Sequence, residues 1–239
     1  MKPIYRFLLA GIITAAVRLP AQTITSQPTS QVVPPGGSVS FTVAVSGTGP
    51  YSYHWQLAGT NLPSLIATVA GGGGYYPNDG SPATNVTLSP QGLALDASGN
   101  LFIADSYWNR IFKVRTNGII VSVAGSGSPG LGSYSGDGRS ATNANLNQPS
   151  GVTLDTTGNL FIADTSNNRI RKVDTNNIIT TVAGNGNDGF SGDGGGILAT
   201  DTSLWLPYGV AVDSTGNLFI ADQQNSRVRK VRFFTDYSG

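Results

Sequence analysis

The sequence contains no cysteine and no glutamate, and it has one histidine, His54, and one methionine among its 239 residues. Without cysteine there is no disulfide framework, no thiolate metal site and no cysteine nucleophile. All 13 acidic residues are therefore aspartate, which favours turns and caps over helix interiors. Glycine contributes 32 residues and proline 13, while only 11% of the residues are charged. This composition predicts an all-β protein with many turns.

The charge balance gives no sign of a polyanionic partner. The full chain has a net charge of +1, but three of its 14 basic residues lie in the first 21 positions, so the remainder carries 11 basic and 13 acidic residues. A near-neutral, slightly acidic body offers no electrostatic attraction to nucleic acid or to an anionic membrane. We therefore expect no nucleic-acid partner.

The N-terminus has the pattern of a secretory signal peptide. Lys2 and Arg6 precede an apolar run at residues 7–17, and a Leu-Pro-Ala sequence that ends at Ala21 follows it. This order predicts a signal at residues 1–21 with cleavage after Ala21; a short buried segment is the alternative. The run is short for a bilayer span, and no other stretch could cross a membrane. The sequence therefore predicts a secreted, cell-surface or periplasmic protein.

Residues 22–63 are rich in Ser, Thr and Val. Apolar and polar side chains alternate from residue 39 to residue 45, and Tyr51, Tyr53 and Trp55 alternate on the next segment, a period typical of half-buried strands. This segment resembles the first half of a bacterial Ig-like domain, with Trp55 where the core tryptophan of such a sandwich stands. Because three or four strands cannot close a sandwich core, this half Ig-like segment needs a partner.

From residue 64 to residue 239 the chain repeats itself. Three stretches align, PQGLALDASGNLFIADSYWNRIFKVRTNGIIVSVAG, PSGVTLDTTGNLFIADTSNNRIRKVDTNNIITTVAG and PYGVAVDSTGNLFIADQQNSRVRKVRFF. Asp105, Asp164 and Asp222 mark the same position in each stretch. The units cover about 90–125, 149–184 and 207–234, and a Gly-rich insert separates one unit from the next. Self-similarity of this length indicates a repeat architecture.

Each unit predicts four short strands separated by Asp, Asn and Gly turns. In the second unit we expect them at residues 151–155, 159–163, 169–173 and 178–183. Four short strands per repeat are typical of a β-propeller blade, whereas the rungs of a β-helix, the alternative, are shorter. The shared core N-L-F-I-A-D-x-x-N-x-R-I-x-K-V resembles the NHL repeat, in which a histidine often stands where this chain has Arg110, Arg169 and Arg227. The resemblance implies three four-stranded propeller blades.

The two ends of the repeat region complement each other. Residues 65–70, LIATVA, match the fourth strand of a unit, while the last unit, which starts at Pro207, has no fourth strand. Residues 65–70 are therefore a candidate closing strand. Three blades are fewer than a propeller ring needs, so the ring is incomplete. Three arrangements are open: a missing C-terminal region with further blades, a second chain that exchanges the outer strand to give a six-bladed ring, or an open arc.

Side chains for enzyme chemistry are scarce in the repeats. His54 lies outside them, and without cysteine, glutamate or a second histidine neither a zinc site nor a Ser-His-Asp triad has candidates there. NHL-like and related six-bladed propellers include metal-dependent lyases and lactonases, which depend on His or Glu ligands. The resemblance therefore implies the scaffold without the activity, and we expect no catalytic residue, no metal site and no cofactor.

The inserts contain three Asp-Gly pairs, at Asp79, Asp137 and Asp193. Calcium loops use several carboxylates at alternating positions. One aspartate per loop favours a plain turn, and weak calcium binding is the alternative.

Repeated polar residues mark the expected blade structure. Asp105, Asp164 and Asp222 end the second strands, where a carboxylate can accept N–H groups of the following turn; a ring of functional carboxylates is the alternative. We expect the basic residues of the third strands to pair with neighbouring aspartates on a solvated surface: Arg110, Lys113, Arg169, Arg171, Lys172, Arg227, Arg229 and Lys230. Some intracellular NHL domains bind RNA through basic faces, but predicted export and the lack of interleaved aromatics disfavour that alternative.

Residues that break the repeat are the candidate ligand face. Structural needs are the same in every blade, so the non-repeated aromatics Trp108, Tyr107, Trp205 and Tyr208 are better candidates for contact with a protein or carbohydrate. Surface drift or packing under the inserts is the alternative. The sequence thus predicts an exported, non-enzymatic binding or surface-display module. A lactonase- or lyase-type enzyme and a purely structural unit of a larger cell-surface protein are the competing hypotheses.

Overall fold

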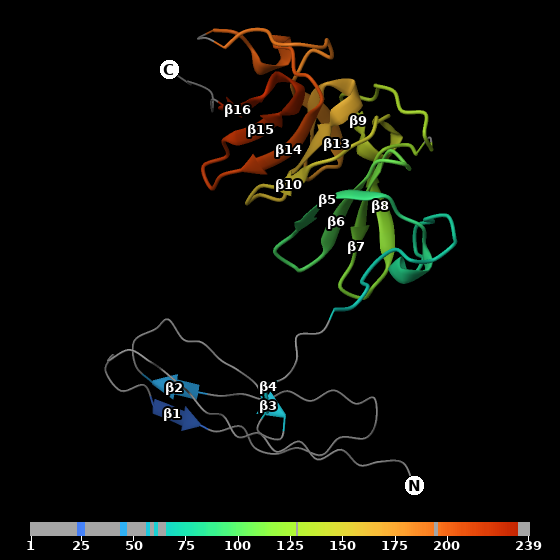
Figure 1. Cartoon of the computed structure of the whole chain (residues 1–239), viewed down its shortest axis with the longest axis vertical. Coiled ribbons are helices and arrows are strands. Elements are labelled where there is room, and N and C mark those ends of the chain that lie inside the picture. The colour runs from blue at the N-terminus through green and yellow to red at the C-terminus, as the bar shows by residue number, and fades with distance from the viewer. Residues whose placement is uncertain are drawn as a thin grey trace. The chain divides into compact units, whose positions relative to one another are not determined.

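The computed structural model describes residues 23–26, 44–46, 56–57, 60–61, 66–127, 129–193 and 196–233. The chain divides into two compact units, Met1–Ala67 and Thr68–Gly239 (Figure 1). In the first unit, two antiparallel pairs are formed, β1 (Thr23–Ser26) with β2 (Ala44–Ser46) and β3 (Gln56–Leu57) with β4 (Thr60–Asn61). The signal at 1–21, His54 and Trp55 lie outside the described residues, so the signal peptide and the Ig-like resemblance stay predictions.

The second unit consists of three antiparallel sheets that fan out side by side (Figure 1). The first sheet contains β5 (Pro90–Leu95), β6 (Leu101–Asp105), β7 (Arg110–Val114) and β8 (Ile120–Ala124). The second contains β10 (Val152–Leu154), β11 (Leu160–Asp164), β12 (Arg169–Val173) and β13 (Ile178–Ala183), with β9 (Arg139–Ser140) outside β13. The third contains β14 (Pro207–Val212), β15 (Leu218–Asp222) and β16 (Arg227–Val231).

The sheets are the blades predicted from the repeat, and the all-β fold class is confirmed. Strands three and four of the second unit have the expected bounds. The second strand is shifted by one residue, because Asp164 still pairs with Arg169 in the ladder. The third sheet has three strands in the part of the chain that the structure describes, and the sheets do not close into a ring.

The first two inserts lie along the outer strand of the blade that follows them. Pro82 forms an antiparallel bridge with Ile119 next to β8, and β9 pairs with β13 in the second blade. Every insert then forms a short 3-10 turn: η1 (Ala83–Asn85), η2 (Ala141–Asn143) and η4 (Ala199–Asp201). Two further 3-10 turns, η3 (Thr165–Asn167) and η5 (Gln223–Asn225), follow the second strands. The inserts are therefore parts of the blades.

The hydrophobic core lies between neighbouring blades and under the inserts. Successive side chains of a strand point to opposite faces, and in the LFIAD strands of the first two blades both faces are covered. Phe102 and Ala104 pack against the second blade, whereas Ile103 packs with Ala83 and Val86 under the first insert. This double burial explains why the second strands read as continuous apolar runs.

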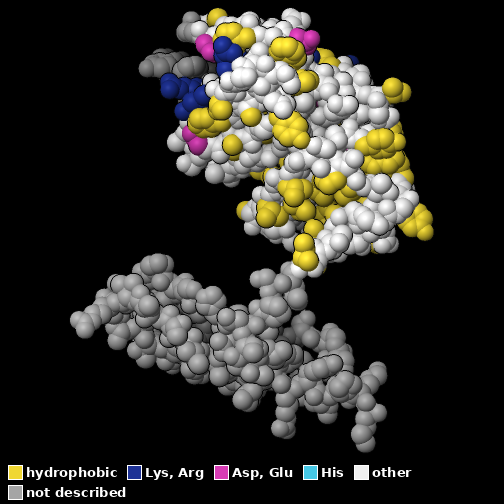
Figure 2. Space-filling view, in the orientation of Figure 1, with side chains coloured by type: hydrophobic (Ala, Val, Ile, Leu, Met, Phe, Trp, Pro, Cys, Tyr) yellow, Lys and Arg dark blue, Asp and Glu magenta, His cyan; other side chains and the backbone are white. Residues whose placement is uncertain are grey.

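The two outer faces of the three-blade arc are exposed. Val228 on β16 is 76% exposed, while its repeat equivalents Ile111 and Ile170 are fully buried between blades. At the other end of the arc, Leu93 and Leu95 of β5 are 61% and 66% exposed. Figure 2 shows hydrophobic side chains gathered over this part of the first blade. Each outer face therefore exposes apolar side chains at positions that are buried where two blades pack together.

Residues 66–70 of the candidate closing strand form no strand with any described segment. A fourth strand needs the third strand of its own blade, and β7 and β12 already pair with β8 and β13. The junction that follows keeps the repeat geometry, since the Gly71 N–H donates to Ala83 O as Gly125 does to Ala141 O. Residues 66–70 thus precede the first insert in the same way as β8 precedes the second insert, but they pair with no described strand.

Candidate functional site

The candidate site lies at one end of the blades, where the first strands start and the second strands end. Antiparallel pairing brings these points together, because Pro90 is opposite Asp105 and Pro207 is opposite Asp222. All four aromatic candidates follow or precede these positions in the sequence. They therefore share one end of the arc, although they come from two different blades.

In the first blade, the Asp105 carboxylate holds the turn that carries Tyr107 and Trp108. Its Oδ1 accepts the N–H groups of Tyr107 and Trp108 at 3.1 and 2.9 Å, and its Oδ2 accepts the Ser89 N–H at 2.7 Å. Asp105 is fully buried, and burial raises the pKa of this carboxyl. The carboxylate therefore points into the blade, where backbone N–H groups take it up.

The same position in the other blades adds a cation. Asp164 Oδ2 accepts from Asn167 Nδ2 at 2.9 Å and from Arg171 Nη1 at 3.2 Å. Asp222 Oδ2 has the equivalent contacts with Asn225 and Arg229 at 2.8 and 3.2 Å. Burial of Asp164 raises its pKa to about 6, since desolvation outweighs these donors.

Two of the basic residues on the third strands clamp the inserts. Arg171 Nη2 lies 2.7 Å from Asp137 Oδ1 and donates to Ser135 O at 3.0 Å, and Arg229 Nη2 lies 2.8 Å from Asp193 Oδ1. The expected pairing with aspartate is present, but the expected solvated surface is wrong for Arg171, which is fully buried between the insert and the blade. Such a buried cation is held by its carboxylates and carbonyls.

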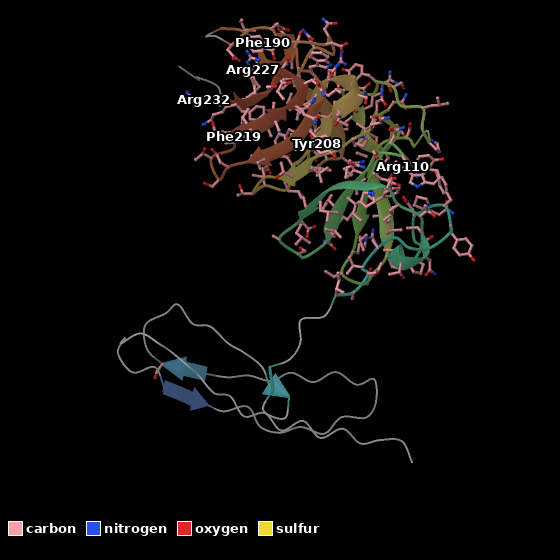
Figure 3. The ribbon with its side chains drawn as sticks, in the orientation of Figure 1. Arg110, Phe190, Tyr208, Phe219, Arg227 and Arg232 are labelled. Atoms are coloured by element: carbon pink, nitrogen blue, oxygen red, sulfur yellow. The ribbon has the colours of Figure 1, made fainter. Side chains whose placement is uncertain are left out.

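Aromatic side chains of the inserts cover the first basic residue of each third strand. The guanidinium of Arg169 lies 3.7 Å from the centre of the Tyr134 ring, and that of Arg227 lies 4.0 Å from the Phe190 ring (Figure 3). In the first blade Arg110 lies 5.8 Å from the Tyr76 ring. The cation–π contacts thus cover the basic stripe in part, since Arg110 and Arg169 are half-buried while Arg227 stays exposed.

Trp108 is the centre of an aromatic cluster on the first blade. Its ring meets Tyr76 and Tyr107 edge-on at 4.6 and 4.9 Å, and its Nε1 donates to Thr87 O at 3.0 Å. Trp108 also packs against the core of the first blade, whereas Tyr107 is 52% exposed. Tyr76 was missed as a candidate, although Tyr76, Tyr134 and Phe190 all stand three residues before the Asp of an insert.

Tyr208 belongs to a polar cluster at the starts of the three first strands. Its hydroxyl donates to Gln91 Oε1 of the first blade at 2.7 Å, and its carbonyl accepts from the Ser150 hydroxyl of the second blade at 2.6 Å. Gln91, Ser150 and Tyr208 occupy the same repeat position, so one residue from each blade meets here. Tyr208 is 44% exposed and lies toward the middle of the arc (Figure 3).

A shallow pocket of about 480 Å³ adjoins Tyr208 on the outer face of the last blade. Gly209, Ala221, Gln223, Ser226, Arg227 and Val228 line it together with Tyr208. Trp205 is 40% exposed and precedes β14, and its backbone N–H donates to Asp222 Oδ1 at 2.8 Å. Within the described residues, no ring contact or hydrogen bond joins Trp205 or Tyr208 to the Tyr107–Trp108 pair. The structure therefore yields two aromatic groups at one end of the arc.

The described residues contain no group of three or more His, Cys, Asp or Glu side chains that could hold a metal ion. Over the same residues, no helix has the length and apolar character needed to span a bilayer.

Comparisons with known proteins agree on the repeat. The family model for the Teneurin NHL domain matches residues 126–191. Teneurin-1 of Mus musculus is 30% identical over 193 residues, which is 70% of this chain and 7% of that protein. NHL repeat-containing protein 2 of Gallus gallus is 39% identical over 110 residues, which is 45% of this chain and 14% of that protein. The chain thus spans a small part of these relatives.

Solved structures with similar folds include a binding protein and an enzyme. An auxiliary nutrient binding protein from Bacteroides ovatus aligns with a TM-score of 0.48 and 20% identity, over 62% of this chain and 37% of that one. A gluconolactonase from Xanthomonas campestris aligns with a TM-score of 0.39 and 14% identity, over 56% and 34% of the two chains.

The three sheets, their shared turns and their repeated Asp–Arg contacts define a protein built from propeller-blade repeats. The sequence matches give these repeats their class: they are NHL repeats.

Proposed function

We propose that the chain is an exported, non-enzymatic binding or surface-display module that holds a protein or glycan partner through the end of the blades that carries Tyr107, Trp108, Trp205 and Tyr208. The observation that carries the proposal is the position of these non-repeated aromatics. All four lie at one end of the arc, and three of them are at least 40% exposed. Large, half-exposed aromatic rings supply most of the contact energy in many interfaces and stack well on sugars.

The polar cluster around Tyr208 supports a binding role. Gln91 Nε2 contacts the Ser106 hydroxyl at 3.3 Å, and the Tyr208 hydroxyl contacts Gln91 at 2.7 Å. These groups hold the Tyr208 ring in one position, which lowers the entropy lost when a ligand orders a side chain. Hydroxyl and amide groups next to an exposed ring are suited to a polar ligand such as a glycan or a peptide backbone.

The proposal includes no cofactor and no reaction. Carboxylates that a calcium loop would use are occupied, since Asp137 and Asp193 pair with Arg171 and Arg229. Asp105, Asp164 and Asp222 are fully buried and take up turn and side-chain donors, so they are poorly placed for general acid or base catalysis. A scaffold with exposed rings and inward carboxylates favours binding over catalysis.

The test replaces the three exposed rings together, with Tyr107→Ala, Trp205→Ala and Tyr208→Ala. We expect binding to the cell-envelope fraction or to a glycan array to weaken by at least ~10-fold, because each lost aromatic anchor costs about 1–2 kcal/mol. Thermal melting measures whether the blades stay folded. The matched control is Phe233→Ala, a ring that is 45% exposed and follows the far end of β16. If the triple variant and the control bind equally well, the aromatic end is not the binding site.

A further inference from the structure

An unfilled groove runs along β16 in the last blade. It has a volume of about 520 Å³ and lies between residues 229–232 on one side and residues 196–199 of the third insert on the other. Its floor consists of four apolar residues and one threonine, Ala199, Thr202, Leu204, Ile220 and Val231, and the Thr202 hydroxyl donates to Ala199 O. Because β16 pairs only with β15, its outer backbone groups have no partner strand among the described residues.

The first two blades show what such a groove holds. In the second blade, Ala141, Ala144, Leu146, Ile162 and Val173 surround the fully buried Ile179 of β13. These five residues are the repeat equivalents of the groove floor. In the first blade, Ala83, Val86, Ile103 and Val114 surround the fully buried Ile120 of β8 in the same way. The groove is therefore a fourth-strand site that lacks its central isoleucine.

The chain contains a further copy of that strand. Residues 65–71, LIATVAG, align with IIVSVAG at 119–125 and IITTVAG at 178–184, which places Ile66 at the position of Ile120 and Ile179. Those two isoleucines are fully buried, whereas Ile66 is 101% exposed. Ala70 packs against the core of the first blade, at the opposite end of the arc from β16. The second blade lies between them, because β10 contacts both β5 and β14, so the end of the strand at Ala70 is held two blades away from the groove.

The outer faces of the arc complement each other in the same way. The last blade exposes Ala221 and Val228. Their equivalents in the second blade, Ala163 and Ile170, are fully buried between blades. The first blade exposes Leu93, whose equivalent Val152 is packed between the first two blades. An interface between the last blade of one copy and the first blade of another would bury the same positions as the internal interfaces.

We propose that a second copy of this chain occupies the groove, with its residues 66–70 paired antiparallel to β16. The ladder of the second blade sets the register: Val173 is opposite Ile179 and Lys172 is opposite Thr180. By the repeat, Val231 lies opposite Ile66 of the second copy and Lys230 lies opposite Ala67. Two such contacts, related by a two-fold axis, join two three-blade arcs into one closed ring of six blades.

The first experiment measures the mass of the whole chain in solution by light scattering. We expect the mass of two chains, and we expect Ile66→Asp to weaken the dimer by ~100-fold, because an isoleucine is lost from an apolar site and a carboxylate is placed in it. Ile66→Val, which keeps most of the apolar contact, is the matched control. Because Ile66 is fully exposed in the single chain, both variants should melt as cooperatively as the parent chain.

The second experiment uses the absence of cysteine from the chain. Ala67→Cys protein and Lys230→Cys protein are mixed and oxidised, and a disulfide between two different chains is expected from the proposed register. Thr68→Cys replaces Ala67→Cys in the control, because neighbouring residues of a strand point to opposite faces. That control should cross-link far more slowly.

Three results would overturn the proposal. A single-chain mass at ~100 µM shows that the groove does not recruit a second copy. A dimer that survives Ile66→Asp without loss shows that another surface joins the chains. Cross-linking within one chain, in the Ala67→Cys/Lys230→Cys double variant, shows that the strand closes on its own β16. Aromatic-end binding is measured separately, so its failure leaves this result unaffected.

Discussion

Arg171 is a fully buried cation that joins three parts of the second blade. It contacts Asp164 at the end of β11, Asp137 in the insert, and the carbonyl of Ser135 next to it. The first blade has Phe112 at this position and buries it just as completely, and the ion pairs of the described residues include none with Asp105. One repeat position therefore accepts either a ring or a paired cation, provided that its surroundings change with it.

Replacing Arg171 should be among the most costly single changes. In Arg171→Met the apolar stem is kept, but Asp164 remains buried without its cation, so we expect a loss of about 3–5 kcal/mol in the free energy of unfolding. Urea unfolding followed by circular dichroism measures it. Lys172→Met is the control, because Lys172 is only partly buried and should cost less than about 1 kcal/mol. Equal losses in both variants would contradict the role given to the buried pair.

At the scale of elements, the blades depend on the junction between a fourth strand and the next insert. Gly125 follows β8 with φ of 92°, and a Cβ there would lie 2.2 Å from Asn109 O. Its N–H donates to Ala141 O at 2.9 Å, which ties the first blade to the insert of the second. Only glycine allows both the backbone angle and the close approach.

Comparing Gly118 with Gly125 separates the cost of the backbone angle from the cost of the close approach, because both have a positive φ but only Gly125 has a backbone atom close to the position of a Cβ. Gly118, in the turn before β8, has φ of 79° with no atom within 4 Å of a Cβ. We expect Gly118→Ala to cost about 1 kcal/mol from the backbone angle alone. Gly125→Ala should cost at least about 2 kcal/mol, because Asn109 O must also move. Thermal unfolding of the two variants decides it, and a smaller loss for Gly125→Ala would show that the junction is not tightly packed.

At the scale of the whole molecule, the same hairpin turn occurs once in each blade, so its effect on the pH dependence of stability is repeated three times. Asp96, Asp155 and Asp213 each close the hairpin between the first and second strands, where Oδ1 accepts the N–H group of the Asn four residues later at 2.9 Å. The hydrogen bond from the Asn100 side chain is the main cause that lowers the pKa of Asp96 to about 2. The pKa of Asp155 is lowered as well: burial opposes the shift, but hydrogen bonds from Asn159 and Thr157 outweigh it. Hydrogen bonds from Asn217 and Thr215 lower the pKa of Asp213.

These turns predict a loss of stability in acid. The unfolded aspartates take up protons near their ordinary pKa of 3.8, before the folded ones do, so the free energy of unfolding falls as the pH drops from about 4 to about 2. Asp164, whose pKa is raised to about 6, has the opposite effect between pH 6 and pH 4. Urea unfolding at pH 2 to 7 measures both limbs, and Asp155→Asn should reduce the acid limb. A stability that stays flat below pH 4 would contradict the prediction.

The sequence by itself determined the repeat, the four-strand order of a blade and the turns. These follow from local rules: apolar runs such as LFIAD form buried strands, and D-x-x-G-N forms a hairpin turn. Only the tertiary structure decided which polar residues are inside. Arg171 stands at the repeat position of the apolar Phe112 and is buried just as completely, because the insert over the second blade supplies Asp137 and the Ser135 carbonyl as its partners. The tertiary structure also brought the starts of the first strands together, since the hydrogen bond from Tyr208 to Gln91 joins residues 117 positions apart, a separation that no local pattern encodes.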